Sequence, residues 1–300
     1  MGAIISYFFG QRLKVAGNDY QVVKRIGEGG FSFVFLVRHG GKKYALKRML
    51  IQIDEQEEAA HNEIEAHGLV DHPNVMPLVA HSIAERGCTS RREALLVFPF
   101  FPNGSVQDLI EKSQKSGVPL AEERIYKMFR STCLGVRAFH DHSPPYAHRD
   151  IKPHNLLLQA NRADTVLMDL GSVAQGRVDV RTRQQALTLQ ETCAQTCTAS
   201  YRAPELFDVP SECKIDERTD VWSLGCVLFA MAFGDSPFDG STLSALSGKV
   251  TFPSSHPYSQ DFCDLITWMA TVDHTKRPTV EQILSRIPAQ SGSTVLTMQV

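Results

Sequence analysis

The sequence predicts an α+β protein of two lobes, in which a small antiparallel β-sheet with one main helix precedes a larger, mainly helical lobe. Up to Phe100, short segments rich in Val, Phe and Tyr are separated by glycine turns, which is typical of hairpin strands. From Ser105 onward, apolar residues recur at helical spacing, for example Ile125, Met128 and Phe129. A chain of 300 residues is long enough to build both lobes.

Composition excludes several classes of protein. The formal net charge is −2 and no long basic run occurs, so nucleic acid is not expected as a partner. The seven cysteines are irregularly spaced without a Cys-x-x-Cys pair, which favours reduced thiols. No set of histidines has the spacing of zinc ligands. The longest apolar stretch, 221–233, is shorter than the ~20 residues that span a bilayer.

The amino terminus has its own signal. Met1-Gly2-Ala3-Ile4-Ile5-Ser6 fits the N-myristoylation pattern, in which Gly2 is acylated after Met1 is removed. We therefore expect a lipid-anchor segment over 1–19, a folded domain over 20–288 and a flexible tail over 289–300. Ile4, Ile5, Tyr7, Phe8 and Phe9 would insert beside the lipid, with Arg12 and Lys14 near the headgroups.

Strands are expected over 20–26, 33–38 and 43–47, and the first two flank the glycine turn Gly27-Glu28-Gly29-Gly30-Phe31-Ser32. Glycines let a backbone approach phosphate groups closely, although Ser32 replaces a third glycine that such loops commonly carry. An ordinary hairpin turn is the alternative. The side chains or backbone that would contact a nucleotide here are those of Ile26, Gly27, Gly29, Val34, Ala45 and Lys47.

A lysine on the third strand and a carboxylate on the following helix form the next candidate pair. Lys43-Tyr44-Ala45-Leu46-Lys47 matches the pattern in which the last lysine grips the α- and β-phosphates of ATP. The segment 54–70 is rich in Glu and Ala and is expected to be helical. Its Glu63 is the preferred partner of Lys47, and Glu65 is the competitor.

Two further strands, over 75–85 and 93–100, complete the first lobe, which spans 20–98. A hinge is expected over 99–104, where the carbonyl of Pro99 and the amide of Phe101 would bond an adenine ring. Phe98 would close the pocket behind that ring. The second lobe spans 105–288 and begins with Ser105 as a helix N-cap.

The central motif is His148-Arg149-Asp150-Ile151-Lys152-Pro153-His154-Asn155, followed by Asp169-Leu170-Gly171. This is the pattern of a protein kinase catalytic loop and its metal-binding turn. Phosphoryl transfer depends mainly on positioning and charge stabilisation. Asp150 is placed to act as base or to orient the substrate hydroxyl, Lys152 to neutralise the γ-phosphate, and Asn155 and Asp169 to hold Mg²⁺.

The activation segment is expected over 169–205, with a helix in its middle over 184–197. Thr198 is the candidate for contact with the catalytic Asp and Lys, and Arg149 could receive a phosphate. Asp220 is expected to cap backbone amides of the catalytic loop. Arg277 is expected to pair with Glu205.

With these motifs, the chain resembles the eukaryotic protein kinases over nearly its full length, and within them the Numb-associated kinases. The closer resemblance rests on the glycine turn, on Asp169-Leu170-Gly171-Ser172, on Gln185-Ala186-Leu187-Thr188-Leu189-Gln190 and on Ile215-Asp216-Glu217-Arg218-Thr219-Asp220. It implies the two-lobed protein kinase fold, use of ATP and Mg²⁺, phosphorylation of protein Ser or Thr, autophosphorylation and a helical activation segment.

The resemblance also implies a cytoplasmic, peripherally membrane-associated protein on Golgi or other internal membranes. The catalytic unit is expected to be monomeric. Relatives carry cysteines for palmitoylation near the acylated end, whereas this chain has none before Cys88. One myristoyl chain binds membranes only marginally, with K on the order of 10⁴ M⁻¹, so a second signal is needed. Two rival interpretations are a kinase-like scaffold that binds ATP and a small-molecule kinase, and tyrosine phosphorylation as a side activity stays open.

Overall fold

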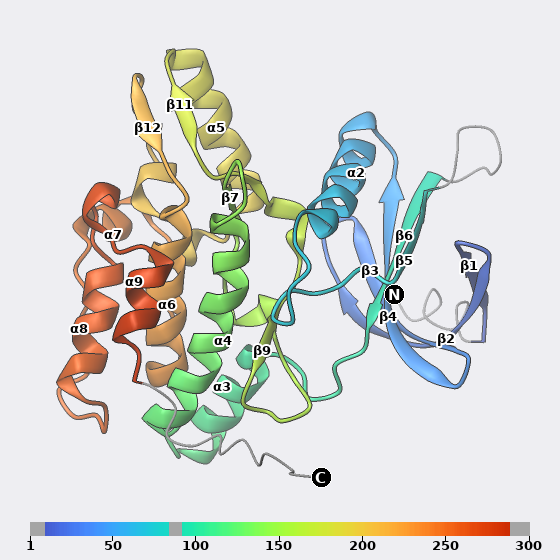
Figure 1. Ribbon diagram of the computed structural model, residues 1–300, viewed down its shortest axis with the longest axis horizontal. Coiled ribbons are helices and arrows are strands. Elements are labelled where there is room, and N and C mark those ends of the chain that lie inside the picture. Colours follow the sequence, from blue (N-terminus) through green and yellow to red (C-terminus); the bar gives the residue numbers. More distant parts are fainter. Residues whose placement is uncertain (1–9, 84–91, 289–300) are drawn as a thin grey trace, which may run out of the picture.

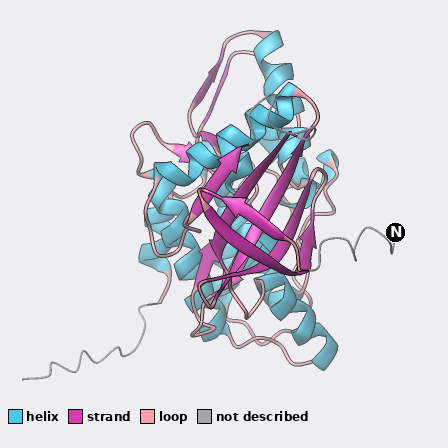
Figure 2. Cartoon of the chain, turned by 90° about the vertical axis from the view of Figure 1, so that its right-hand side faces the viewer, coloured by secondary structure: helices cyan, strands magenta, loops and turns pink. Residues whose placement is uncertain are grey.

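The computed structural model describes residues 10–83 and 92–288, and it has the two lobes expected from the sequence (Figure 1). The N-lobe contains a six-stranded antiparallel sheet of order β1-β2-β3-β4-β6-β5. Its strands are β1 (Arg12–Val15), β2 (Asn18–Glu28), β3 (Ser32–His39), β4 (Lys42–Ile51), β5 (Ala80–Ile83) and β6 (Arg92–Pro99). Figure 2 shows this sheet in front of the helices.

Two parts of the sheet differ from the sequence-based expectation. The segment expected to be a lipid anchor overlaps the sheet, because β1 pairs with β2 from Arg12 to Val15. Leu13 and Val15 are buried, so this end of the segment belongs to the N-lobe core. The strand expected from Val75 is shorter, since Val75 forms only an isolated bridge to Leu167 and β5 begins at Ala80. The first nine residues and the tail from 289 lie outside the described residues.

One helix is present in the described part of the N-lobe, α2 (Asp54–Leu69), and it packs on the sheet through the buried Ala60, while the buried Ala66 belongs to the larger core cluster. Glu63 lies on the same face and is only 2% exposed. Burial of a carboxylate is costly unless a cation faces it. The helix therefore needs a positive partner at this position, which the sheet supplies.

The C-lobe is built around α6 (Thr219–Phe233), in which Trp222, Leu224 and Val227 are fully buried. Helices that surround it bury apolar stripes against the same core. These helices are α3 (Val106–Ser116), α4 (Glu122–His140), α5 (Arg183–Thr196), α7 (Thr242–Ser247), α8 (Gln260–Met269) and α9 (Val280–Arg286). Helices α7 and α8 were not expected from the sequence.

Three short strand pairs hold the loops between α4 and α6. They join β7 (Tyr146–Ala147) to β10 (Ala174–Gln175), β8 (Leu156–Leu158) to β9 (Thr165–Leu167), and β11 (Val178–Val180) to β12 (Cys213–Ile215). The first two pairs flank the catalytic loop on either side. The third ties the activation segment to the chain before α6, and it lies beside α5 at the end of the lobe (Figure 1).

No helix within residues 10–83 and 92–288 is long and apolar enough to cross a membrane. Cysteines 133, 193, 197, 213, 226 and 263 all carry free thiols.

Candidate active site

A lysine from the sheet, a glutamate from α2 and an aspartate from the turn after β9 meet between the lobes. The Lys47 Nζ lies 2.8 Å from both carboxylate oxygens of Glu63 and 3.0 Å from Oδ1 of Asp169. Glu65 is exposed, so the structure selects Glu63 as the partner of Lys47. Since these residues come from distant parts of the chain, the ion pairs fix α2 and the turn against the sheet.

Charge pairing in this triad overrides burial at two of the three groups. Burial lowers the pKa of the Lys47 ammonium, but the Asp169 and Glu63 carboxylates outweigh it and the net pKa is raised. Burial raises the pKa of the Asp169 carboxyl, yet the Lys47 ammonium brings it below its ordinary value. For Glu63, burial is the largest effect and the pKa is raised, although Lys47 opposes it. A lysine kept charged at this position can face phosphate oxygens.

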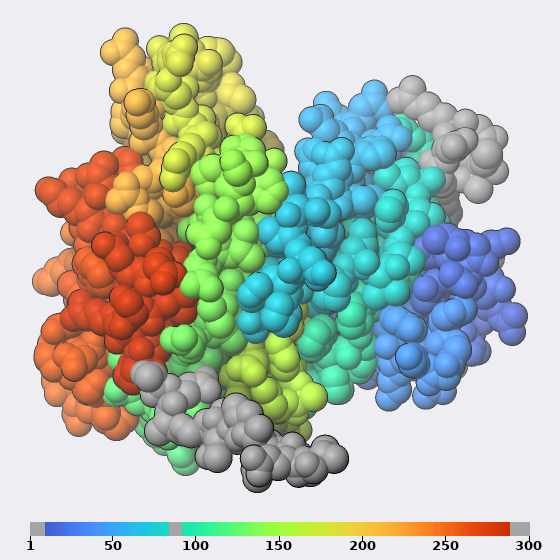
Figure 3. Space-filling view, in the orientation of Figure 1, coloured from blue at the N-terminus to red at the C-terminus, as the bar shows by residue number. Residues whose placement is uncertain are grey.

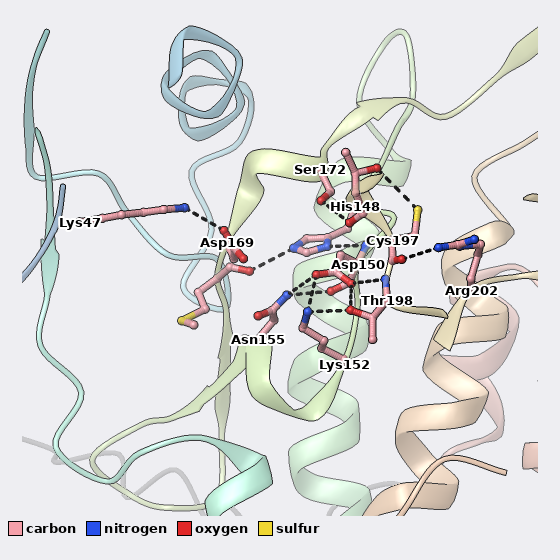
Figure 4. Close-up of polar contacts among 12 residues, drawn as sticks. Lys47, His148, Asp150, Lys152, Asn155, Asp169, Ser172, Cys197, Thr198 and Arg202 are labelled. Atoms are coloured by element: carbon pink, nitrogen blue, oxygen red, sulfur yellow. Dashed lines mark hydrogen bonds and ion pairs between the residues drawn. The ribbon is translucent and has the colours of Figure 1, made fainter. Parts of the chain in front are cut away.

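The catalytic-loop carboxylate gathers four donors. Asp150 accepts from the Thr198 amide at 2.9 Å and from the Thr198 hydroxyl at 2.6 Å through Oδ1. Its Oδ2 accepts from Lys152 Nζ at 2.7 Å and from Asn155 Nδ2 at 3.1 Å. Lys152 also donates to Thr198 Oγ1 at 2.7 Å. Figure 4 shows this cluster, in which side chains from the catalytic loop and the activation segment converge.

The backbone of the loop is held by one buried carboxylate beneath it. Asp220, at the start of α6, accepts from the amides of His148 at 2.7 Å and Arg149 at 2.8 Å. Its Oδ2 also lies 3.0 Å from Nε2 of His140. Arg149 has φ of 66°, the left-handed region that costs non-glycine residues energy. The two hydrogen bonds that the His148 and Arg149 amides donate to Asp220 hold the loop in this conformation.

His148 links the loop to the metal-binding turn, a role that sequence reasoning missed. The Asp150 amide donates to His148 Nδ1 at 3.3 Å. That contact leaves the proton on Nε2, which donates to the carbonyl of Met168 at 3.2 Å. The presence of a histidine at the first position of the loop motif was the signal. His148 thus couples Asp150 to Met168, the residue that precedes Asp169.

Asp220→Asn is expected to destabilise the protein by about 3 kcal/mol, because a buried carboxylate that accepts several hydrogen bonds is replaced by an amide. The pKa of Asp220 is lowered in the folded protein: burial raises it, but His140 and the loop amides outweigh burial. A lowered pKa contributes stability above about pH 4, the unfolded value, and this is lost as pH falls through the folded pKa. Denaturant unfolding at neutral and acid pH measures both effects. The exposed Asp261→Asn variant is the control, and equal stability of the two variants would contradict the capping role.

The activation segment is ordered by contacts of its own. Its helix α5 begins with a capping box in which Thr182 and Gln185 exchange side-chain-to-backbone hydrogen bonds. The helix end is fixed by Ser172 Oγ, which donates to the Thr196 carbonyl at 2.9 Å. Arg202 donates to the Cys197 carbonyl at 2.8 Å, next to Thr198. These bonds place Thr198, and the Arg149 guanidinium donates to the Gln175 carbonyl at 2.9 Å.

The residues expected to contact a nucleotide lie on adjacent strands. The register pairs Gly27 with Val34, Val34 with Lys47, and Ala45 with Phe98. A Cβ at Gly29 would lie 2.9 Å from Ser32 Oγ, so a side chain there would have to displace the Ser32 hydroxyl. Ile26, which precedes Gly27 on β2, is 40% exposed.

The hinge leaves the sheet at the end of β6. Pro99 is its last residue and lies opposite Tyr44, while Phe101 follows in the loop and packs against the core at α2. Phe98 is buried and its ring lies 5.1 Å from that of His67. The space behind the strand is thus filled by two rings, as expected for a small back pocket.

Asn155 and Asp169 offer oxygen ligands that suit a hard divalent cation. Asn155 Nδ2 donates to the carbonyl and the carboxylate of Asp150, so its Oδ1 is the atom left to meet a metal. The Met168 amide donates to the Asn155 carbonyl at 2.9 Å, which brings Asn155 beside the turn that carries Asp169. The donor set therefore fits a divalent cation next to phosphate groups.

Comparison with known proteins agrees with this geometry. Residues 20–287 match the family model described as protein kinase domain. Serine/threonine-protein kinase 16 of Homo sapiens is 45% identical over 90% of this chain and 90% of its own length. A probable serine/threonine-protein kinase of Dictyostelium discoideum is 35% identical over 96% of this chain and 98% of its own. The chain belongs to the protein kinase family and is a serine/threonine protein kinase.

Proposed function

We propose that the protein transfers the γ-phosphoryl group of ATP, bound with Mg²⁺, to Ser or Thr of protein substrates and to its own chain. The observation that carries this proposal is the contact set of Asp150, whose carboxylate meets both Lys152 and Thr198. A hydroxyl that entered beside Thr198 would find a proton acceptor and a cation at one place. The catalytic unit works as a monomer, because the site is formed within one chain.

Each residue has one task in this reaction. Lys47, oriented by Glu63, binds the α- and β-phosphates, and Ile26, Val34 and Ala45 cover the adenine. The metal ion neutralises phosphate charge when bound, and Asn155 with Asp169 would hold it. Asp150 orients the attacking hydroxyl and accepts its proton, while Lys152 faces the γ-phosphate.

Selectivity for Ser and Thr is expected to depend on Thr198. Thr198→Ala removes the hydroxyl that bridges Asp150 and Lys152, and it should lower phosphorylation of a basic protein by at least about tenfold, since one charge-assisted hydrogen bond is lost. Thr198→Ser keeps the hydroxyl and should retain most activity. Phosphoamino-acid analysis of the product should show phosphoserine and phosphothreonine. Equal rates for the Ala and Ser variants, or phosphotyrosine as the main product, would contradict this assignment.

We further propose that the chain is a Numb-associated kinase, close to the myristoylated and palmitoylated serine/threonine kinase of that family, and acts on Golgi or other secretory-pathway membranes. The resemblance of the glycine turn and of the activation segment supports this proposal. The myristoylation pattern at Gly2 supports membrane association, although Gly2 lies outside the described residues.

The anchoring role of the apolar amino terminus is tested by Phe8→Ser with Phe9→Ser, which keeps the myristoylation pattern intact. Both positions lie outside the described residues. We expect the double variant to shift from the membrane to the soluble fraction, because one acyl chain alone binds only marginally. Fractionation of cells that express the acylated protein measures this, with Gly2→Ala as the positive control for release. An unchanged membrane fraction for the double variant would refute the insertion of these rings.

A further inference from the structure

We propose that one exposed face of the N-lobe, on its β1–β4 side, docks on an anionic lipid bilayer. This face, the basic face, comprises Arg12, Lys14, Lys24, Arg38, Lys42 and Lys43. The proposal rests on the membrane association proposed above and names its second signal. It also makes a separate claim, namely that binding depends on anionic lipid and on these six cations.

The first observation is a local excess of positive charge. Residues 1–51 carry nine lysines and arginines but only two carboxylates, Asp19 and Glu28, although the whole chain has a formal charge of −2. Three of the nine cations are paired: Lys47 with Glu63 and Asp169, Arg48 with Glu93, and Arg25 with Glu28. The six cations of the basic face are exposed, and none forms an ion pair within the part of the chain that the structure describes.

The second observation is that the strand register gathers these cations on one side. Arg12 lies opposite Gln21, Gln21 opposite Arg38, and Arg38 opposite Lys43, which forms one row across four strands. Neighbouring strands are ~4.8 Å apart, so the row spans roughly 15 Å. The alternate residues Leu13, Tyr20, Val22, Val37 and Tyr44 pack into the N-lobe core. Because side chains alternate along a strand, the row lies on the opposite side of the sheet from this cluster, the side that Ala45 and Lys47 share, and its cations are exposed.

The remaining members extend this row. Lys14 follows Arg12 by two residues and is on the same side of β1, with Asp19 opposite it. Lys42 lies beside the Gly40-Gly41 turn between β3 and β4, and Lys24 follows the bulge after Val22 and lies opposite Leu36. One carboxylate in register with this many cations leaves the face strongly positive.

The third observation is where the face lies. β1, β2 and the β3–β4 turn occupy the side of the N-lobe away from the C-lobe (Figure 1), at the right-hand edge of the space-filling view (Figure 3). The described chain begins here, since the Gly10 amide donates to the Val22 carbonyl at 3.2 Å. Residues 2–9 contain no charged side chain and join the basic face directly. A bilayer at this face would leave α5 and the activation segment uncovered.

These features together favour a bilayer over a soluble acidic partner. An apolar, acylatable segment enters lipid, and adjacent cations are attracted to anionic headgroups within about a Debye length, ~8–10 Å. Because a single acyl chain anchors a protein only marginally, cations beside it supply the missing affinity. Acidic peptides would use the cations but not the apolar segment.

The test measures sedimentation of full-length protein, with and without N-myristoylation, on vesicles of phosphatidylcholine alone or of equal parts phosphatidylcholine and phosphatidylserine. The variant carries Arg12→Gln, Lys14→Gln, Arg38→Gln and Lys43→Gln. We expect wild type to prefer the phosphatidylserine vesicles and to be released by salt. Binding of the variant to those vesicles should be at least about a hundredfold weaker, because the four lost cations each contribute separately to the attraction.

A matched control replaces four exposed C-lobe lysines by Gln: Lys112, Lys115, Lys214 and Lys249. Both variants should phosphorylate a soluble protein like wild type, which shows that they are folded and separates this test from the kinase assignment. Three results would overturn the proposal. The basic-face variant could bind the phosphatidylserine vesicles as tightly as wild type, or the control variant could lose as much binding as the basic-face variant. In the third result, polyglutamate abolishes the vesicle binding of wild type, while phosphatidylserine does not increase it. If one of these results is found but the myristoylated protein still binds phosphatidylcholine vesicles, the acyl anchor is supported and the basic face is refuted.

Discussion

Asp150→Asn is expected to lower the turnover number by about 10²–10⁴-fold, the usual contribution of a positioned general base. The amide is isosteric and can still accept from Thr198 through its oxygen, but it cannot accept a proton from the substrate hydroxyl. Lys152 would lose its carboxylate partner at 2.7 Å. Steady-state kinetics with a basic protein substrate measures the effect.

Affinity for ATP separates this explanation from misfolding. Asp150 makes no contact with Lys47, Glu63 or the strands expected to cover adenine, so ATP binding should change less than about threefold, within the usual spread of such measurements. Asp261→Asn, at an exposed position of α8, is the matched control and should behave as wild type. Turnover within tenfold of wild type in Asp150→Asn would remove the residue from the mechanism.

Arg277→Met is expected to destabilise the protein by about 3–5 kcal/mol, because removal of one partner leaves a buried charge uncompensated. The Arg277 guanidinium is fully buried and contacts both oxygens of Glu205, at 2.7 and 2.6 Å. It also donates to the carbonyls of Thr271 and Val272 and lies 5.2 Å from the Trp222 ring. Denaturant unfolding gives the change in free energy.

Two comparisons test this explanation. Arg181 and Asp179 form an ion pair of 2.8 Å on the surface, and Arg181→Met should cost less than about 1 kcal/mol because water screens such pairs. Adding Glu205→Leu to Arg277→Met should restore part of the stability, since no unpaired charge then stays buried. Similar losses for Arg277→Met and Arg181→Met would show that burial of the pair is irrelevant.

Long periodic segments and dense motifs made most of the architecture predictable. The helical spacing of Ile125, Met128 and Phe129 predicted a helix where α4 lies, and the apolar run 221–233 forms most of α6. The motif alignment that favoured Glu63 over Glu65 agrees with burial, because only Glu63 lies on the face of α2 that meets the sheet. In these cases local sequence and tertiary packing favour the same structure.

The elements that were not predicted are short or depend on distant residues. β1 has only four residues, and β11 and β12 have three each, too few for a period to stand out. α7 has six residues and exposes Leu243, so it lacks a clear apolar face. The link from His148 to Met168 could not be read from spacing, because it depends on how β9 returns to the loop.

The basic face shows the same limit. Formal charge on the whole chain is slightly negative, and no basic run occurs in the sequence. Arg12, Arg38 and Lys43 are far apart in sequence and meet only through the strand register. A surface of this kind becomes visible only once the sheet is known.

The most direct test of the kinase mechanism is transfer of label from γ-labelled ATP with Mg²⁺ to a basic protein, by wild type, Asp150→Asn and Asp169→Asn. We expect transfer to Ser and Thr by wild type only, dependent on the metal, with autophosphorylation sites identified in the same reaction. Tight binding of ATP without transfer by wild type would contradict the mechanism. Transfer at the wild-type rate in either variant would contradict the assigned roles of these two carboxylates.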